Sequence, residues 1–236
     1  MAKRVAIVQS CYVPWKGFFD LINQVDHFLL YDDAEYSKNT WRNRNRIKTA
    51  SGTQWLTIPV TYSGRSRQRI DEVQVSDPRW SQKHWKTLQQ SYSRAPHFDR
   101  YAAELEELYL GSADMQLSAI NRRFIDHICT VLGIETTISW TSEVYDGPLT
   151  GTDRLVRLCG ALGADVYLSG PAARAYLDVD RLKEAGVDVD WMSYEDYPTY
   201  PQLHPPFDHA VTTLDLLFNV GPDAPSYLKS FGRSAG

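Results

Sequence analysis

The order of apolar runs in the first third of the chain constrains the fold more than any other feature. Residues 5–8 form a short β-branched run preceded by charge, which predicts a buried strand. Residues 14–25 follow with apolar side chains at helical spacing, and residues 27–31 form a second apolar run. A strand, a helix and a strand in this order predict a βαβ unit, whose strands pair in parallel.

The second half of the chain repeats this alternation. Apolar runs predict strands at 137–140, 165–169 and 187–192 within it, and at 54–60 and 73–75 before it. Helical patterns lie at 152–162 and 182–185, and the stretch 81–132 predicts two or three consecutive amphipathic helices.

We therefore expect an α/β fold: a Rossmann-like, mostly parallel sheet with helices on both faces and a helical insertion in the middle. The whole of residues 1–236 is expected to form a single domain, with 81–133 as a helical insertion or lid. Residues 195–225 begin rich in proline and tyrosine, which predicts an irregular segment followed by a closing helix.

Composition narrows the function class. A net charge of −4 gives the chain no overall attraction to nucleic acid. Its three cysteines, widely spaced, form neither a disulfide framework nor a CxxC metal motif, and we assign no metal. No apolar run is long enough for a signal peptide or for a membrane span. We expect a cytoplasmic protein without membrane insertion, and its oligomeric state stays open.

The segment "QSCYVPWKGFFD" follows the first predicted strand and opens the first predicted helix. Ligands of open α/β sheets bind at the carboxyl ends of strands, so Gln9, Cys11, Tyr12, Trp15 and Lys16 are candidate substrate-binding residues. The alternative is a packed turn in which Tyr12 and Trp15 belong to the core. A helix N-terminus lowers a thiol pKa, but no base for a nucleophilic Cys11 is identifiable.

Two carboxylates, Asp32 and Asp33, end the second predicted strand. They suit a metal, a ribose hydroxyl or an amine, or they lie in a solvated turn. We take Asp32 as a candidate substrate-binding residue. Asp33 is a candidate catalytic residue, because a carboxylate can accept the proton that an amine loses on attack.

Basic residues then alternate at period two: Arg42, Arg44, Arg46 and Lys48, with Lys38 before them. In an extended segment the four share one face, and Asn43 faces the other way. Guanidinium forks suit phosphate or carboxylate, which predicts an anionic substrate. The alternatives are a structural ion-pair network with the acidic pair at 32–33, and RNA backbone binding.

Three more positions are candidates. His84, early on a predicted helix, can act as an acid or base near neutral pH. Ser169 and Gly170 end a predicted parallel strand, and His204 lies in the segment "YPTYPQLHPPF". We expect these last three to contact substrate.

The strings "QSCYVPWKGFFDLI", "YDDAEYSKNTWRNRNRIKT", "QWLTIPV", "YLSGPAARAYL" and "YPQLHPPFDH" with "LDLLFNVGPDAP" resemble the WbqC-like family. The matching positions are Gln9, Tyr12, Pro14, Trp15, Gly17, Asp33, Tyr36, Lys38, Trp41, Asn43, Arg44 and Lys48. The resemblance implies that these residues matter without assigning roles. The family often has a small polar residue where this chain has Cys11, which argues against an obligatory thiol.

The resemblance implies a place in bacterial surface-polysaccharide (O-antigen) pathways, with aminoacyl transfer, suggested to be glycyl transfer, onto an amino sugar. We expect an amide-forming transferase that acts on a nucleotide-linked amino sugar, with Asp33, His84 and Lys38 as candidate catalytic residues. The donor, and with it any cofactor, is unknown: acyl-CoA, aminoacyl-tRNA and an ATP-derived acyl group all fit, so tRNA is a potential partner. Alternatives are a non-catalytic anion-binding or partner-binding scaffold and, ranked last, a metal-dependent hydrolase.

Overall fold

A five-stranded sheet forms the centre of the protein in the computed structural model, which describes residues 2–61, 67–113 and 115–232. Its strands are β1 (Arg4–Val8), β2 (His27–Leu30), β5 (Thr137–Trp140), β6 (Val166–Ser169) and β7 (Asp188–Trp191). They lie in the order β5-β2-β1-β6-β7, and every neighbouring pair is parallel. The predicted parallel α/β sheet is therefore confirmed.

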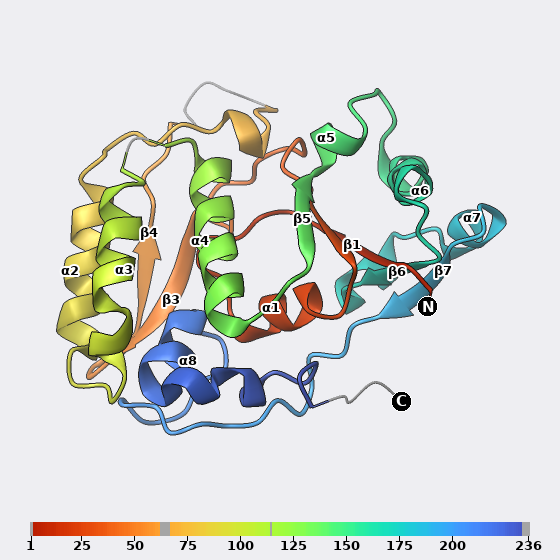
Figure 1. Ribbon diagram of the computed structural model, residues 1–236. Helices are drawn as coiled ribbons and strands as arrows, with labels where there is room; N and C mark the ends of the chain where they lie inside the picture. The colour runs from red at the N-terminus through yellow and green to blue at the C-terminus, as the bar shows by residue number, and fades with distance from the viewer. Residues whose placement is uncertain (1, 62–66, 114, 233–236) are drawn as a thin grey trace.

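Both faces of the sheet are covered, because successive strand residues point to opposite sides. Ala6 of β1 belongs to one core cluster, and its neighbours Val5 and Ile7 belong to the other. The first cluster is covered by α1 (Lys16–Ile22), α4 (Leu117–Leu132) and α8 (Thr213–Val220). The second is covered by α6 (Gly151–Leu162) and α7 (Val179–Glu184), beside β6 and β7 in Figure 1.

One part of the predicted sheet is wrong. Residues 54–60 do not join the parallel sheet: β4 (Gly52–Thr57) instead pairs antiparallel with β3 (Arg44–Thr49) in a separate hairpin. The predicted strand at 73–75 is reduced to isolated bridges such as Val60 with Val75. Core contacts stabilise the hairpin, because Ile47 and Leu56 face the first core cluster.

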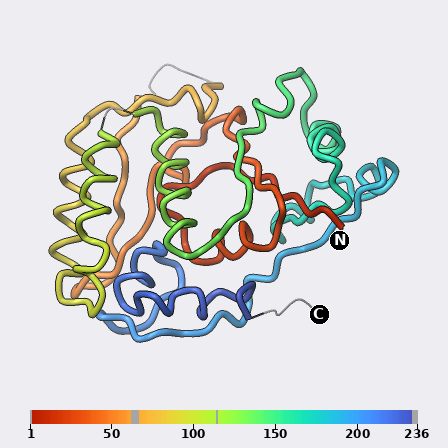
Figure 2. Tube along the Cα trace, viewed as in Figure 1, coloured from red at the N-terminus to blue at the C-terminus, as the bar shows by residue number. Residues whose placement is uncertain are grey.

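The predicted helical stretch in the middle of the chain forms α2 (Trp80–Tyr92), α3 (Phe98–Leu110) and α4. Figures 1 and 2 show α2 and α3 side by side, next to the hairpin and at the far end of the molecule from α7. Gly133, with φ 73°, ends α4 in the left-handed conformation that favours glycine. Side chains of α4 reach the sheet edge, where Asn121 donates a hydrogen bond to the Ser10 hydroxyl at 2.8 Å. A lid role for this insertion stays a prediction.

Short helical turns complete the fold: η1 (Ile70–Glu72), α5 (Thr141–Val144), η2 (Pro171–Ala175) and η3 (Gly221–Tyr227). The irregular tail between β7 and α8 runs back along the hairpin, where the Thr212 amide donates to the Arg46 carbonyl at 2.9 Å. Within the described ranges, no helix combines the length and the apolar character that a membrane crossing requires.

Candidate functional site

The topology marks one edge of the sheet as the place for a ligand. From β1 the chain passes through α1 to β2 on one side, whereas β6 pairs with β1 on the other. Ligands of open α/β sheets bind at such a switch point, beyond the carboxyl ends of the strands. The residues that follow β1 therefore lie where a substrate is expected.

A cavity of about 290 Å³ opens at this place. Its walls come from the loop after β1, the start of α1, the hairpin and the tail: Cys11, Pro14, Trp15, Phe18, Trp41, Asn45, His209 and Ala210. Most of these side chains are apolar. The cavity therefore suits a group that leaves water when it binds.

The cavity wall depends on a glycine. A Cβ atom at Gly17 would lie 2.2 Å from the indole of Trp15, so only glycine lets that ring fold back over the first turn of α1. The Trp15 ring also meets Tyr194 edge to face, with 5.3 Å between the ring centroids.

A second surface borders the cavity, and we call it the arginine–tryptophan shelf: Trp41, Arg44, Arg46 and Trp55. The two indole centroids are 5.3 Å apart, and the side chains are 44 % and 43 % exposed, which is high for tryptophan. The guanidinium carbon of Arg44 lies 4.3 Å from the Trp55 centroid, and that of Arg46 lies 5.7 Å away. Trp41 belongs to both surfaces, so the shelf and the cavity are continuous.

In the part of the chain that the structure describes, the two shelf arginines have no carboxylate partner. Within residues 2–61, 67–113 and 115–232, neither Arg44 nor Arg46 forms an ion pair, and each Nε is buried without a hydrogen-bond partner. The proposed structural network would need Asp32 and Asp33, and both are engaged elsewhere. A buried donor without a partner is costly, so these guanidinium groups are suited to an anionic ligand.

The four basic residues of the period-two alternation have different roles. Arg42 donates to the carbonyl oxygens of Gln9 (2.8 Å) and Ser10 (2.9 Å) and contacts Sγ of Cys11 at 3.0 Å. It therefore fastens the loop after β1. Lys48 is buried, and its ammonium donates to the Pro206 carbonyl. Of the four basic residues, only Arg44 and Arg46 are available to a ligand.

The neighbouring polar residues hold the hairpin in place. Asn43 donates to the Ile58 carbonyl at 3.0 Å, and Asn45 donates to the carbonyl of Val13 at 2.7 Å. Tyr36 is buried, with 1 % of its surface exposed, whereas Lys38 is exposed in the turn that precedes Trp41.

The adjacent carboxylates at the end of β2 point to different partners. Asp32 is buried and accepts hydrogen bonds from the Ser10 amide at 2.8 Å and from the Ser118 hydroxyl. Burial raises the pKa of Asp32, and those hydrogen bonds oppose the shift. Asp33 forms a buried ion pair with Arg154 and also accepts from the Thr141 hydroxyl at 2.7 Å. Both carboxylates therefore hold structural elements together.

His84 lies in an aromatic cluster rather than at the cavity. Its Nδ1 is hydrogen-bonded to the Tyr12 hydroxyl at 2.8 Å, and its ring meets Trp80 edge to face. Burial lowers the pKa of His84 to about 4, so the ring is neutral near pH 7. The structure thus places two predicted site residues, His84 and Tyr12, together in the core.

Two polar groups at the start of α1 are strongly affected by burial. Burial raises the pKa of the Cys11 thiol, and the Arg42 charge only partly opposes this, so the thiol is protonated near neutral pH. The Lys16 ammonium donates to the Pro198 carbonyl at 2.6 Å, and burial lowers its pKa to about 8. The Lys16 ammonium therefore loses its proton more easily than in water.

Ser169 and Gly170 lie at the end of β6, where Ser169 is covered and Gly170 is partly exposed. Ser169 is buried, and a Cβ at Gly170 would lie 3.8 Å from the Tyr194 hydroxyl. His204 is buried in the tail, where its Nε2 is 2.8 Å from the Ser91 carbonyl. None of the three lines the cavity.

Sequence reasoning missed Trp55, Tyr194 and His209. Trp55 pairs with Arg46 across the hairpin, a register that the sequence would reveal only if both strands were recognised. Tyr194 and His209 come from the end of β7 and from the tail. No local pattern distinguishes them from other aromatic residues there.

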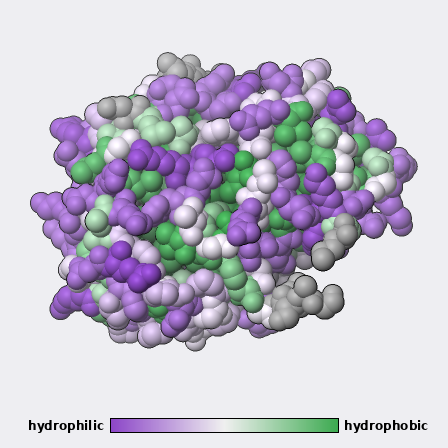
Figure 3. Space-filling model, in the orientation of Figure 1, coloured by the Kyte–Doolittle hydropathy of each residue, from purple (hydrophilic) through white to green (hydrophobic). Residues whose placement is uncertain are grey.

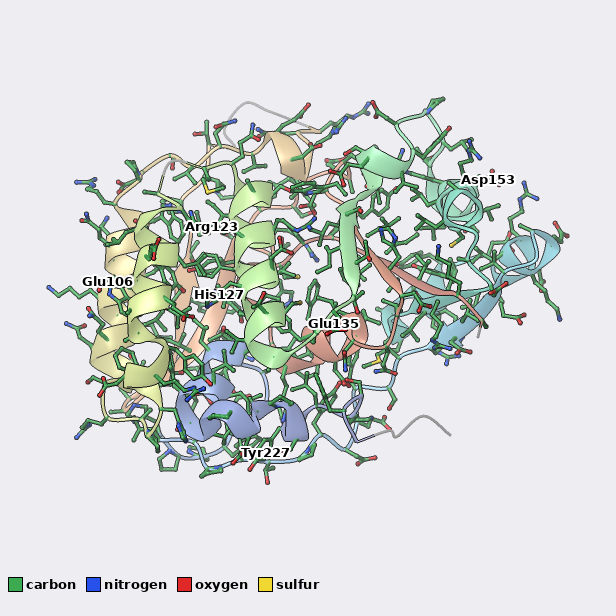
Figure 4. All side chains as sticks on the ribbon, in the orientation of Figure 1. Glu106, Arg123, His127, Glu135, Asp153 and Tyr227 are labelled. Atoms are coloured by element: carbon green, nitrogen blue, oxygen red, sulfur yellow. The ribbon has the colours of Figure 1, made fainter. Side chains whose placement is uncertain are left out.

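A different hollow lies between α3 and α4, on the face shown in Figures 3 and 4. It is lined by Glu104, Glu107, Leu108, Arg123 and His127, of which Arg123 and His127 are labelled in Figure 4. The Nε2 atom of His127 lies 3.9 Å from a Glu104 carboxylate oxygen, and Arg123 brings a positive charge to the same hollow. Hydrophobic residues on this face form patches among hydrophilic ones (Figure 3). This hollow shares no residue with the cavity.

Comparison with known proteins gives two matches along almost the whole chain. The model of the WbqC-like protein family matches residues 9–227. The chain belongs to this family. It is also 48 % identical over 229 residues to the uncharacterized protein Rv1507c of Mycobacterium tuberculosis. The matched region covers 96 % of this chain and 98 % of that protein. No solved structure matches.

The WbqC-like match includes both surfaces of the site. It begins at Gln9, directly after β1, and ends at Tyr227, after α8. The cavity, the shelf and the tail that carries His209 all lie inside it. The candidate site is therefore part of the region that defines membership of the family.

Proposed function

We propose that this member of the WbqC-like family is an enzyme that transfers an aminoacyl or acyl group, with glycyl as the first candidate, to the amine of a nucleotide-linked amino sugar. The observation that carries the proposal is the continuity of two unlike surfaces. An apolar cavity at the switch point borders a shelf whose two guanidinium groups lack a carboxylate partner among the described residues.

The shelf binds the phosphates of the substrate. Arg44 and Arg46 offer forked donors that match phosphate oxygens, and Trp41 and Trp55 offer flat apolar surface for a sugar or a base. The diphosphate of a nucleotide-linked sugar is the anion that we assign here.

The cavity encloses the reacting groups. Holding the amine and the acyl carbon together replaces an encounter in solution, and the apolar walls keep out the water that would hydrolyse an activated acyl group. The same apolar walls favour the neutral amine, because burial penalises the charged form of a titratable group. The donor is an ester (aminoacyl-tRNA), a thioester (acyl-CoA) or a mixed anhydride with phosphate (an ATP-derived acyl group), and the biological setting is bacterial surface-sugar synthesis.

The test is a transfer assay with the full-length protein. Nucleoside-diphosphate amino sugars are incubated with glycyl-tRNA, with acyl-CoA, or with an amino acid, ATP and Mg²⁺, and products are detected by mass spectrometry. We expect an amide product with one donor class. The same sugar nucleotide with its amine already acetylated is the matched control and stays unchanged.

Binding of the sugar nucleotide without transfer from any donor would contradict an enzymatic role and favour the scaffold alternative. Hydrolysis of the sugar nucleotide without added donor, abolished by a chelator, would instead favour the metal-dependent hydrolase.

A further inference from the structure

The cavity has three polar side chains in its wall, and two of them are engaged. Asn45 donates from its Nδ2 to the carbonyls of Tyr12 and Val13, and its Oδ1 accepts from the Arg46 amide at 2.7 Å. The Cys11 sulfur contacts the Arg42 guanidinium. The third polar side chain is that of His209.

The imidazole of His209 is half-buried and has no hydrogen-bond partner among residues 2–61, 67–113 and 115–232, and its Nδ1 is a buried orphan. Its ring packs edge to face on Phe207, with 4.5 Å between the centroids. Other ring nitrogens are occupied: His27 lies 3.0 Å from the Ser139 hydroxyl, and His204 is hydrogen-bonded to a carbonyl. A buried ring nitrogen without a hydrogen-bond partner from the described residues needs one from a ligand or water.

We propose that His209 is the catalytic base of the transfer: it accepts the proton that the amino group of the sugar loses during attack on the acyl donor. This inference rests on the proposed function. The amine nitrogen forms a bond to the acyl carbon of an ester or thioester, and the C–O or C–S bond to the leaving group breaks. The proton passes from the nitrogen to His209 and then to the departing alkoxide or thiolate, so the products are an amide and a neutral alcohol or thiol.

The surroundings of His209 suit a base. Burial lowers its pKa, the Lys16 ammonium lowers it further, and Asp208 opposes both. Across the cavity, Cys11 carries no charge near neutral pH because its thiol pKa is raised. The ring is therefore neutral and able to take up a proton at the pH where an enzyme of this kind works.

The experiment compares the wild-type protein with His209→Gln, using the donor and acceptor pair that gives an amide in the transfer assay. We expect kcat to fall by about 10²- to 10⁴-fold with the KM for the sugar nucleotide unchanged, which is the range for removal of a general base. The acidic limb of the kcat–pH profile should disappear. His127→Gln is the matched control: it lies in the hollow on α4 and should keep wild-type kcat.

His209→Ala provides a second variant with a readout that a structural role would not move. Added imidazole should restore part of its kcat in proportion to the neutral imidazole concentration. Circular dichroism identifies any variant that fails to fold. If one of the two variants fails to fold, the kcat of the other tests the role of His209. Wild-type kcat in His209→Gln, or no rescue of a folded His209→Ala, overturns the inference and leaves the transferase intact. If the wild-type protein gives no amide with any pair, the proposed function fails and this inference fails with it.

Discussion

Replacing Arg44 or Arg46 with alanine should remove affinity for phosphates and leave the protein folded. Both side chains lack ion pairs within the described residues, and what each loses within the protein is a cation–π contact with Trp55. Such a contact at a half-exposed site contributes about 0.5–1 kcal/mol. For a chain of this length that corresponds to a fall in Tm of roughly 1–4 °C.

The effect on binding should be far larger. A hydrogen bond to a charged group contributes about 1.5–3 kcal/mol, so removing both guanidinium groups costs roughly 3 kcal/mol or more. Since about 1.4 kcal/mol corresponds to a tenfold change, the double variant should bind a diphosphate at least about 100-fold more weakly.

Arg42→Ala is the matched control, because it removes the same side chain at the same spacing. It leaves the carbonyls of Gln9 and Ser10 without their donor and removes the contact with Cys11. At about 1 kcal/mol for each contact, the free energy of unfolding should fall by roughly 2–3 kcal/mol.

The affinity is measured by isothermal titration with inorganic pyrophosphate at low salt. The stability is measured by thermal unfolding followed by circular dichroism. Unfolding of Arg44→Ala at a Tm as low as that of Arg42→Ala would show that the shelf arginines are structural. Unchanged pyrophosphate affinity in the double variant would refute the anion site itself.

Three further predictions follow from single contacts. Gly17→Ala places a Cβ 2.2 Å from the Trp15 indole, so the ring must move and the affinity for the sugar nucleotide should fall. An unchanged affinity in isothermal titration with the sugar nucleotide would contradict the proposed cavity. Asp33→Asn leaves the buried charge of Arg154 without its partner, which should cost about 3–5 kcal/mol in urea unfolding; a loss below 1 kcal/mol would refute this. The pKa of His84 is about 4 in the folded protein and 6.5 in the unfolded chain, so between pH 4 and pH 6.5 the unfolded state binds more protons. Stability should therefore fall by about 3 kcal/mol as the pH drops from 6.5 to 4, and His84→Gln should flatten that dependence in urea titrations.

The parallel sheet was predictable because its signal is local. The strands β1 and β2, which are covered on both faces, are apolar along most of their length, and the segment between 8 and 27 has helical spacing. The pairing of the hairpin was not, because β4 mixes polar residues with the exposed Trp55 and its partner strand is a run of basic residues. Its pairing depends on core contacts of Ile47 and Leu56 that periodicity alone does not reveal.

The basic alternation shows that the period-two rule holds only for residues inside a strand. Period two places side chains on one face only within a strand, and β3 begins at Arg44, so Arg42 lies outside the rule and turns to the loop after β1. Lys48 is inside the strand, but the tail covers it through the Pro206 carbonyl, 158 residues away. Only the middle of the alternation, Arg44 and Arg46, is available for the anion-binding role, which stays a prediction.

The same tail explains why the cavity could not be assembled from the sequence. Its amides at Thr212 and Thr213 donate to the carbonyls of Arg46 and Pro14, both at 2.9 Å, and these bonds bring His209 against the loop that follows β1. Nothing within the tail specifies those partners, because they belong to the hairpin and to the start of α1. The candidate base of the reaction and the candidate anion site are thus joined by two backbone hydrogen bonds. A substitution that detaches the tail should weaken proton transfer before it weakens phosphate binding.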